Sequence, residues 1–346
     1  MTRTSREVRL VSKPAGLPGP AHFVVTETPL PVPKDGEVLV RNHYFQVFPA
    51  MLRTMIGGGT EVHPALFPGD TLLGPAVGEV VSAPGTSPLR TGELVSHWLG
   101  WREYAAVPAE ACTPLGDDTL PDPVAHLSQG WTAYGALTRA AKVRPGDTVF
   151  VTGGATAVGV LAGQIARLLG AGRVIGTTGS PEKAARMVAE FGYDAALLRG
   201  AEPIADQLAK AAPEGIDVLL DTVGGDHLEA AVAAARPEAR LVLVGVLAAQ
   251  LSPEGTGATA PPVTFDASLL ILRRIQLLGF TAQDHPDALP EWIERFDGWL
   301  RSGAITFPHV RVAGIEHATR VLQETIDGRH LGTVVVDVNR RADADR

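Results

Sequence analysis

The chain has 346 residues, a length that fits a globular protein of two domains with a sizeable core. Hydrophobic residues make up 45% of it and charged residues 20%, which excludes a disordered chain. The formal net charge of −8 gives no general electrostatic attraction to nucleic acid or to an anionic membrane. A single cysteine, Cys112, excludes an intrachain disulfide and a multi-cysteine zinc site.

Neither the start of the sequence nor its apolar runs resemble targeting or membrane segments. Residues 1–14 contain basic residues but no apolar core of a signal peptide. The uncharged stretch at residues 241–253 is too short to span a bilayer. We therefore expect a cytoplasmic protein with neither a membrane nor a nucleic-acid partner.

The first third of the chain has the pattern of a β domain. Up to about residue 123, short β-like runs alternate with turn sequences such as PKDG and PGD. Such runs lie at residues 37–41, 78–81, 93–96 and 103–107. Several short strands with frequent turn signals predict a compact, barrel-like domain.

From about residue 124 the pattern changes to strands and helices in alternation. Apolar strand-like runs lie at residues 148–152, 173–177, 216–221, 241–245 and 275–280, and helix-like segments at 157–169, 181–191 and 289–302. Continuous Val, Leu and Ile runs separated by helices predict a doubly wound parallel sheet covered on both faces.

The last strand-like run, at residues 333–338, resembles those of the first third. We therefore expect the C-terminus to complete the barrel-like domain. The predicted organisation is an α/β protein with a barrel-like domain at residues 1–123, a nucleotide-binding domain at 124–303 and a returning segment at 304–346.

A glycine-rich turn, GGATAVG at residues 153–159, joins the first strand of the second domain to its first helix. Free N–H groups at such a helix N-terminus attract a pyrophosphate. The dinucleotide fingerprint needs glycines for a tight turn, for close phosphate approach and for helix packing. Gly154 and Gly159 fit the first and third roles, whereas Thr156 occupies the middle position. In the alternative interpretation, the glycine-rich turn is only a structural connector. Its position between a strand and a helix favours cofactor binding.

The end of the second strand bears on the choice of nucleotide. An NAD enzyme places a carboxylate there, whereas this chain has TTGSPEK at residues 177–183. Hydroxyls and a lysine suit a 2′-phosphate, so NADP is preferred. In the alternative interpretation, Lys183 is only a solvated helix charge. The predicted contacts at this end are Thr177, Gly179, Ser180, Lys183 and, as a second cation, Arg199.

Several segments, in order and with the spacing of one family, carry a resemblance over nearly the whole chain. They are PGDTLLG at residues 68–74, GWTAY at 130–134, the turn and helix at 153–164, GSPEK at 179–183, DTVGG at 221–225 and GRHLG at 328–332. The chain resembles the medium-chain dehydrogenase/reductase superfamily, in its zinc-free prostaglandin reductase and alkenal double-bond reductase (quinone oxidoreductase-like) branch. The resemblance implies a GroES-like barrel closed by C-terminal strands, a Rossmann domain, and an active site in the cleft between them.

The residues also argue against zinc. Catalytic zinc needs about three Cys, His or Glu ligands, and structural zinc usually four Cys or His. One cysteine cannot supply the structural site, and GPA at residues 74–76 replaces the Gly-His-Glu of zinc-dependent relatives. Without a Lewis acid, reduction of a conjugated C=C bond is favoured over alcohol–carbonyl interconversion. It needs only a hydrogen-bond donor for the enolate oxygen and a proton for the α-carbon.

The resemblance assigns further cofactor contacts position by position. A family tyrosine near the adenosine becomes Leu198, beside Arg199, and two asparagines become Thr222 and His330. The NADP contacts implied in this way are Thr132, Ala157, Val158, Gly159, Thr222, Val223, Gly245, Val246, Leu247, Phe280, Thr281 and His330.

The substrate side departs further from the family. Gln250 stands where the family has a tyrosine after Gly245, and FPAM at residues 48–51 replaces Asp-Pro-Tyr-Met. The amide of Gln250 can donate a hydrogen bond but cannot supply a proton as a phenol does. The candidate catalytic donors are Tyr44, Tyr134 and Gln250, with His97 and Gln46 as further donors. The predicted pocket residues are Phe48, Met51, His97, Trp98 and Trp101. Core packing explains the aromatic ones about as well.

We therefore expect an NADPH-dependent, metal-free ene reductase that transfers hydride to the β-carbon of an α,β-unsaturated ketone or a related conjugated carbonyl. A quinone oxidoreductase, a reductase of an aromatic polyketide-like intermediate and a cofactor-binding protein that has lost catalysis stay open as alternatives. The resemblance also implies a homodimer, with residues 275–280 as a candidate sheet edge, because exposed apolar edges need covering.

Overall fold

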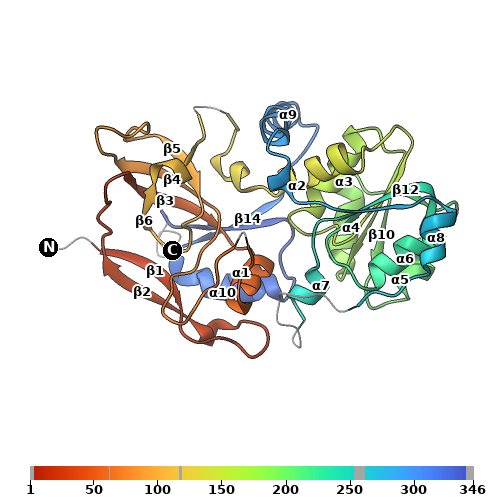
Figure 1. The fold of residues 1–346 in the computed structure, drawn as a ribbon, viewed down its shortest axis with the longest axis horizontal. Helices are drawn as coiled ribbons and strands as arrows, with labels where there is room; N and C mark the ends of the chain where they lie inside the picture. Colours follow the sequence, from red (N-terminus) through yellow and green to blue (C-terminus); the bar gives the residue numbers. More distant parts are fainter. Residues whose placement is uncertain (1–3, 62, 117–118, 253–261, 340–346) are drawn as a thin grey trace. The chain divides into compact units, whose positions relative to one another are not determined.

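The computed structural model describes residues 4–61, 63–116, 119–252 and 262–339. These residues form two compact units (Figure 1). The first contains the described residues of 1–127 and 309–339 together with 251–252, and the second contains 128–250 and 262–308.

The first unit is built on a mixed sheet in the order β14-β15-β3-β4-β5-β7, with β6 also pairing with β3. Its strands are β3 (Glu37–Gln46), β4 (Ala76–Ser82), β5 (Leu94–His97), β6 (Tyr104–Pro108), β7 (Thr113–Pro114), β14 (His309–Ala313) and β15 (Thr333–Asp337). Strand β15 pairs antiparallel with β3, so that Val336 lies opposite Phe45. This pairing confirms that the C-terminal strands close the GroES-like sheet.

Two further strands and two helices complete this unit. Strands β1 (Thr4–Leu10) and β2 (Phe23–Pro29) form an antiparallel pair, which the sequence pattern did not predict. Helices α1 (Pro49–Gly57) and α10 (Ala318–Ile326) contribute side chains to one buried cluster with Phe45 and Trp101. Short 3-10 turns lie at η1 (Pro20–His22), η2 (Ala109–Ala111), η3 (Pro123–Leu127) and η6 (Ile315–His317).

The second unit contains a parallel sheet in the order β10-β9-β8-β11-β12-β13. Its strands are β8 (Thr148–Val151), β9 (Arg173–Thr178), β10 (Ala195–Leu198), β11 (Ile216–Asp221), β12 (Ala235–Leu243) and β13 (Gln276–Gly279). The direction of winding reverses between β8 and β11, and ligands of such sheets bind at the carboxyl ends of the strands at that point. The predicted doubly wound parallel sheet is confirmed, and β13 is an edge strand.

Helices cover this sheet and connect its strands. They are α2 (Gly130–Gly135), which continues as the π-helical turn η4 (Ala136–Ala140), α3 (Gly159–Leu168), α4 (Pro181–Glu190), α5 (Ile204–Ala211), α6 (Asp226–Ala234), α7 (Leu247–Gln250), α8 (Ala267–Leu272), the 3-10 turn η5 (Ala282–Asp284) and α9 (Ala288–Ser302). Helices α3 and α4 contact β9, whereas α5 and α6 contact each other and share a buried cluster with β8 and β11. In the described part of the chain, we find no helix with the length and apolar character of a membrane span.

Candidate functional site

The glycine turn between β8 and α3 brings the backbone of the turn against the start of the helix. Gly153 has a φ of +62°, in the left-handed region that favours glycine, so the tight turn belongs to Gly153 rather than to Gly154 as predicted. A Cβ at Gly154 would clash with the side chain of Met187 on α4, and one at Gly159 with the carbonyl oxygen of Gly153. Gly159 therefore allows the close helix–turn packing expected of the third glycine.

Thr156 takes part in the hydrogen bonding of this turn. Its Oγ1 accepts a hydrogen bond from the N–H of Gly159 at 3.2 Å, and its own N–H donates to the carbonyl oxygen of Gly153 at 2.9 Å. Thr156 therefore supplies an acceptor at the first turn of α3, where backbone N–H groups lack partners within the helix. Ala157 and Val158, half-buried, lie between Thr156 and α3.

The end of β9 supports the glycine turn from one side. The hydroxyl of Thr177 accepts a hydrogen bond from the N–H of Gly153 at 3.0 Å, and its carbonyl oxygen accepts one from Gly154 at 2.7 Å. Thr177 is 1% exposed. Thr177 therefore holds the glycine turn in place from within the core. This favours a supporting role over the direct cofactor contact predicted for it.

Two cations and a hydroxyl lie around the connection from β9 to α4. Ser180 is the N-cap of α4, with its hydroxyl accepting from the N–H of Lys183 at 3.3 Å. A Cβ at Gly179 would lie 3.0 Å from Nη2 of Arg199, whose own N–H donates to the carbonyl oxygen of Thr178. Lys183 is half-buried, and this burial lowers the pKa of its amine. The structure thus brings Gly179, Ser180 and Arg199 together, close to Lys183.

The carboxyl ends of β11 and β12 bring together a second group of predicted contacts. Thr222 donates its N–H to Oγ1 of Thr152 at 2.8 Å and its hydroxyl to the carbonyl oxygen of Thr152 at 2.9 Å. The N–H of Leu247 donates to the carbonyl oxygen of Thr222 at 2.9 Å. Gly245 donates its N–H to the carbonyl oxygen of Asp221 at 3.2 Å, and Val246, half-buried, lies between Gly245 and Leu247.

Three other predicted cofactor residues already have protein contacts. Phe280 is 6% exposed, and its ring stacks on His285 with ring centres 5.0 Å apart. Thr281 donates its hydroxyl to Oδ2 of Asp284 at 2.6 Å. His330 lies in the first unit, where Nε2 is 3.2 Å from a carboxylate oxygen of Glu324. These contacts favour structural roles, most clearly for Phe280. Thr132 is half-buried on α2, and its cofactor contact stays a prediction.

Tyr134 has its hydroxyl committed to a protein carboxylate. It is 1% exposed, and its hydroxyl donates to Oε1 of Glu291 on α9. Burial, together with this hydrogen bond, raises the pKa of Tyr134 to about 12. The geometry therefore favours a structural role over the catalytic role predicted for Tyr134.

His97 is a buried histidine with both ring nitrogens bonded. Its Nε2 donates to Oδ1 of Asn42 at 2.8 Å, and its Nδ1 accepts from the N–H of Leu99 at 3.1 Å. Burial and then the nearby charge of Arg102 lower the pKa of His97 to about 4. Asn42 also donates to the carbonyl oxygens of Leu99 and Arg102, so the pair holds the loop after β5. This favours a structural role for His97, and Asn42 was not identified from the sequence.

The aromatic residues predicted to line a pocket separate into buried and exposed ones. Trp101 is 1% exposed and packs on Phe45 with ring centres 4.9 Å apart, so it belongs to the core rather than to a pocket wall. Met51 is 6% exposed and Phe48 half-buried, and both pack in the same cluster. Trp98 is 45% exposed and lies 5.5 Å from the ring of His63. Trp98 is therefore the member of this group best placed to meet a ligand.

Of the three remaining candidate donors, Gln46 is 2% exposed, and Tyr44 and Gln250 are half-buried. Tyr44 lies on β3, where the guanidinium of Arg311 lies 5.3 Å from its ring centre. Gln250 ends α7, and its N–H donates to the carbonyl oxygen of Val246 at 3.0 Å. The roles predicted for Tyr44 and Gln250 stay predictions.

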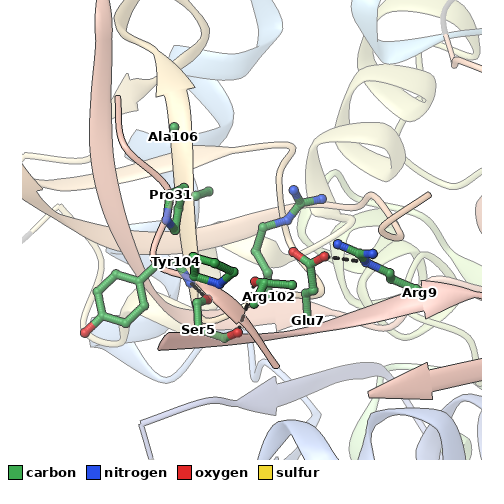
Figure 2. A pocket seen from close by; sticks show the side chains of 10 residues that line it. Ser5, Glu7, Arg9, Pro31, Arg102, Tyr104 and Ala106 are labelled. Atoms are coloured by element: carbon green, nitrogen blue, oxygen red, sulfur yellow. Dashed lines mark hydrogen bonds and ion pairs between the residues drawn. The ribbon is translucent and has the colours of Figure 1, made fainter. Parts of the chain in front are cut away.

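A cavity of about 250 Å³ lies in the first unit beside the β1–β2 pair (Figure 2). Figure 2 shows Glu7 and Arg9 side by side in its wall, where they form an ion pair at 2.6 Å. The cavity is lined by Ser5, Glu7, Arg9, Thr28, Pro29, Pro31, Arg102, Tyr104, Ala105 and Ala106. These residues do not include the predicted substrate or cofactor residues.

The side chains that could bind a metal are dispersed in the described structure. Among residues 4–61, 63–116, 119–252 and 262–339, no group of three or more His, Cys, Asp or Glu side chains is arranged to hold a metal ion. Cys112 is buried, which raises the pKa of its thiol to about 11. The metal-free assignment continues to rest on the sequence and stays a prediction.

Comparison with known proteins places the chain in a family. Residues 6–115 match the family described as the N-terminal domain of oxidoreductases, and residues 157–298 match the family described as zinc-binding dehydrogenases. The chain is 31% identical to Bacillus subtilis YfmJ, which is named as a putative NADP-dependent oxidoreductase, over 98% of this chain and 99% of that protein.

Two further similarities extend over nearly the whole chain. It is 29% identical to the NADPH-dependent curcumin reductase of Escherichia coli, over 95% of each chain. The crystal structure of CurA from Vibrio vulnificus in complex with NADPH has a TM-score of 0.86 at 28% identity, covering 97% of this chain and all of that one. The chain therefore belongs to the medium-chain dehydrogenase/reductase superfamily, in the branch that carries this oxidoreductase N-terminal domain.

Proposed function

We propose that the protein is an NADPH-dependent reductase of the C=C bond in conjugated carbonyl compounds. The observation that carries this proposal is full-length similarity to proteins named for such reactions. They include the E. coli curcumin reductase, a 2-alkenal reductase of Nicotiana tabacum at 29% identity and the (+)-pulegone reductase of Mentha piperita at 30%. Curcumin, 2-alkenals and pulegone all contain a C=C bond conjugated to a carbonyl group, which defines the substrate class.

The residues of the second unit fit NADP. The absence of a Cβ at Gly159 lets the glycine turn approach α3, whose first N–H groups suit a pyrophosphate. Lys183 and Arg199 with the hydroxyl of Ser180 suit the charge of a 2′-phosphate, and TTG at residues 177–179 contains no carboxylate that would repel it. When bound, NADPH supplies the hydride that is added to the β-carbon.

Other predicted residues have distinct tasks in this proposal. The backbone of residues 157–159 holds the pyrophosphate, and the loops at 222–223 and 245–247 hold the nicotinamide side. Holding the nicotinamide C4 beside the β-carbon of the substrate then supplies much of the rate enhancement, because correct orientation replaces a bimolecular encounter.

The carbonyl oxygen of the substrate needs a hydrogen-bond donor as charge develops on it. In the second unit, Gln250 follows the loop at 245–247 and has an amide N–H for this purpose. In the first unit, Tyr44 is the half-buried phenol that remains among the predicted donors as a proton source for the α-carbon. Trp98, exposed at 45%, offers a flat apolar surface for a conjugated substrate.

A homodimer through the β13 edge is the proposed assembly. Leu277 on this strand is 38% exposed, and Ile271 and Leu272 on the preceding helix α8 are 77% and 74% exposed. An edge strand with apolar neighbours is prone to pair with another strand. Sedimentation of Leu277→Lys, compared with the wild type, tests the assembly.

The activity is tested by incubating the protein with NADPH and a panel of enones and 2-alkenals, and by identifying the products by mass spectrometry. We expect saturated carbonyl products. A quinone in a parallel reaction tests the rival activity, which would yield a hydroquinone. Hydroquinone formation with no saturated carbonyl from any panel member would contradict the proposal. NADPH oxidation without a reduced organic product would do the same.

A further inference from the structure

Asp221 is a fully buried carboxylate at the end of β11, on one side of the topological switch point. Its Oδ1 accepts three hydrogen bonds: from the hydroxyl of Thr152 at 2.6 Å and from the N–H groups of Val223 and Gly224 at 3.0 Å each. Its Oδ2 is buried and has no hydrogen-bond partner among the described residues. Within the described structure, one oxygen atom therefore makes all the hydrogen bonds of this side chain.

The donors to Asp221 belong to two loops that flank the switch point. Thr152 follows β8 and directly precedes the glycine turn, whereas Val223 and Gly224 belong to the loop after β11. Thr222 strengthens the link, because its N–H and its hydroxyl both donate to Thr152. A Cβ at Gly153 would lie 2.7 Å from Oγ1 of Thr222, so the two loops are also in close contact.

The loop after β11 needs such an anchor, because its backbone is intrinsically adaptable. Gly224 and Gly225 have φ angles of +76° and +61°, in a region that glycine adopts as freely as others. Backbone hydrogen bonds to α7 use the carbonyl oxygens of Thr222 and Val223, and so leave the N–H groups of Val223 and Gly224 to Asp221. The backbone contacts with α7 thus hold the carbonyl groups of the loop, and the carboxylate of Asp221 holds its N–H groups.

We propose that Asp221 is a positioning residue that orients the nicotinamide-side loop through Oδ1 alone. The inference rests on the proposed function, because the loop matters to the rate only if it holds the hydride-donating ring. A displacement of about 1 Å at a reacting centre lowers rates by about 100-fold. Loss of Asp221 should therefore lower kcat rather than weaken nucleotide binding.

Three variants separate this role from a general contribution to stability. Asp221→Leu removes all three acceptor contacts and keeps the branching at Cγ, in a larger side chain. Asp221→Asn keeps an acceptor oxygen in the place of Oδ1 and replaces the unbonded Oδ2 by the amide nitrogen. Asp217→Leu is the matched control on the same strand, because Asp217 accepts from the N–H of Thr148 at 2.8 Å and pairs with Arg236 at 3.2 Å.

For NADPH-dependent reduction of an enone, we expect Asp221→Leu to lower kcat by about 100-fold while KM for NADPH changes by less than about threefold. Asp221→Asn should retain most of kcat. Asp217→Leu should lower the melting temperature with kcat largely retained. Equal kinetic losses in Asp221→Leu and Asp217→Leu, or equal losses in Asp221→Leu and Asp221→Asn, would overturn the proposal.

Amide hydrogen exchange gives a readout that needs no substrate. Exchange at Val223 and Gly224 should accelerate by more than about tenfold in Asp221→Leu, relative to exchange at Thr148, and remain slow in Asp221→Asn. If Asp221→Leu does not fold, Asp221→Glu takes its place, because it moves the acceptor by one methylene group. Unchanged exchange at both amides would overturn the proposal. A wild-type protein that reduces no conjugated carbonyl would instead contradict the proposed function, while the exchange result still decides the role of Asp221.

Discussion

The hydroxyl of Tyr134 on α2 donates a hydrogen bond to Oε1 of Glu291 on α9, 157 residues further along the chain. Arg139 and Arg295 pair with the same carboxylate, at 2.7 Å and 3.1 Å. The hydrogen bond from Tyr134, and then that from Arg139, lowers the pKa of Glu291 to about 2. The carboxylate thus stays ionised near neutral pH and joins two helices of the second unit.

This relationship predicts a stability effect for Tyr134→Phe. The variant removes one hydrogen bond to a charged group, which costs about 1.5–3 kcal/mol where such a bond is well formed. We expect a lower free energy of unfolding in urea and a turnover rate within about threefold of the wild type. If the variant instead kept its stability and turned over about 100-fold more slowly, the catalytic role predicted from the sequence would be restored.

The cations near Gly179 predict a preference between nucleotides. Lys183→Ala should raise KM for NADPH by about 10- to 100-fold, because a hydrogen bond to a charged group contributes about 1.5–3 kcal/mol. KM for NADH should change little. Lys210→Ala is the control, because Lys210 is an exposed lysine that pairs with Glu202 on the surface. Equal losses for NADPH and NADH in Lys183→Ala would contradict the 2′-phosphate assignment.

The packing of the glycine turn predicts a large effect from a single methyl group. Gly159→Ala places a Cβ against the carbonyl oxygen of Gly153, and the backbone must shift to relieve the clash. We expect a lower melting temperature and weaker NADPH binding by titration. Gly298→Ala is the matched control on α9, where a Cβ has open space and should stabilise the helix by about 1 kcal/mol. NADPH binding and a melting temperature unchanged by Gly159→Ala would contradict the close packing described.

His97 predicts a pH dependence of stability. Its pKa is about 4 in the folded chain and about 6.5 when unfolded, so between these values only the unfolded state takes up the proton. The free energy of unfolding should therefore fall as pH falls from 6.5 towards 4, by about 2 kcal/mol at pH 5. Above pH 6.5, this residue contributes no pH dependence. Urea unfolding of the wild type and of His97→Gln should show a stability difference that changes as pH falls below 6.5, and a constant difference would refute this account of His97.

The sequence predicted the second unit better than the first. Strands buried on both faces of a parallel sheet are continuous apolar runs in the sequence. The predicted bounds of β8, β9 and β11 therefore agree with the structure to within about one residue. Helix α1 was missed because its residues from Pro49 to Ile56 are all buried, and a helix buried on every side has no amphipathic stripe. The β1–β2 pair was missed because its buried residues, such as Ser5, Val8 and Leu10, do not alternate regularly with exposed ones and include a polar side chain, which blurs the apolar pattern.

In the candidate site too, one feature set by neighbouring residues was predicted, and contacts between residues distant in the chain were not. The close packing at Gly159 depends on the local glycine pattern and was predicted, whereas the N-cap at Ser180 was not. The contacts of Tyr134 with Glu291 and of His97 with Asn42 depend on residues 157 and 55 positions apart, which no local pattern reveals. Asp221 is the first residue of the family motif DTVGG, but only the hydrogen bonds at the ends of the paired strands show that it joins two loops.

The central claim, NADPH-dependent reduction of a conjugated C=C bond, is tested most directly by isotope transfer. The protein is incubated with an enone and with NADPH deuterated at the transferred position of C4, and the product is examined by NMR. We expect a saturated ketone that carries deuterium at the β-carbon. Deuterium at the carbinol carbon of an allylic alcohol, or a product without deuterium, would contradict the proposal.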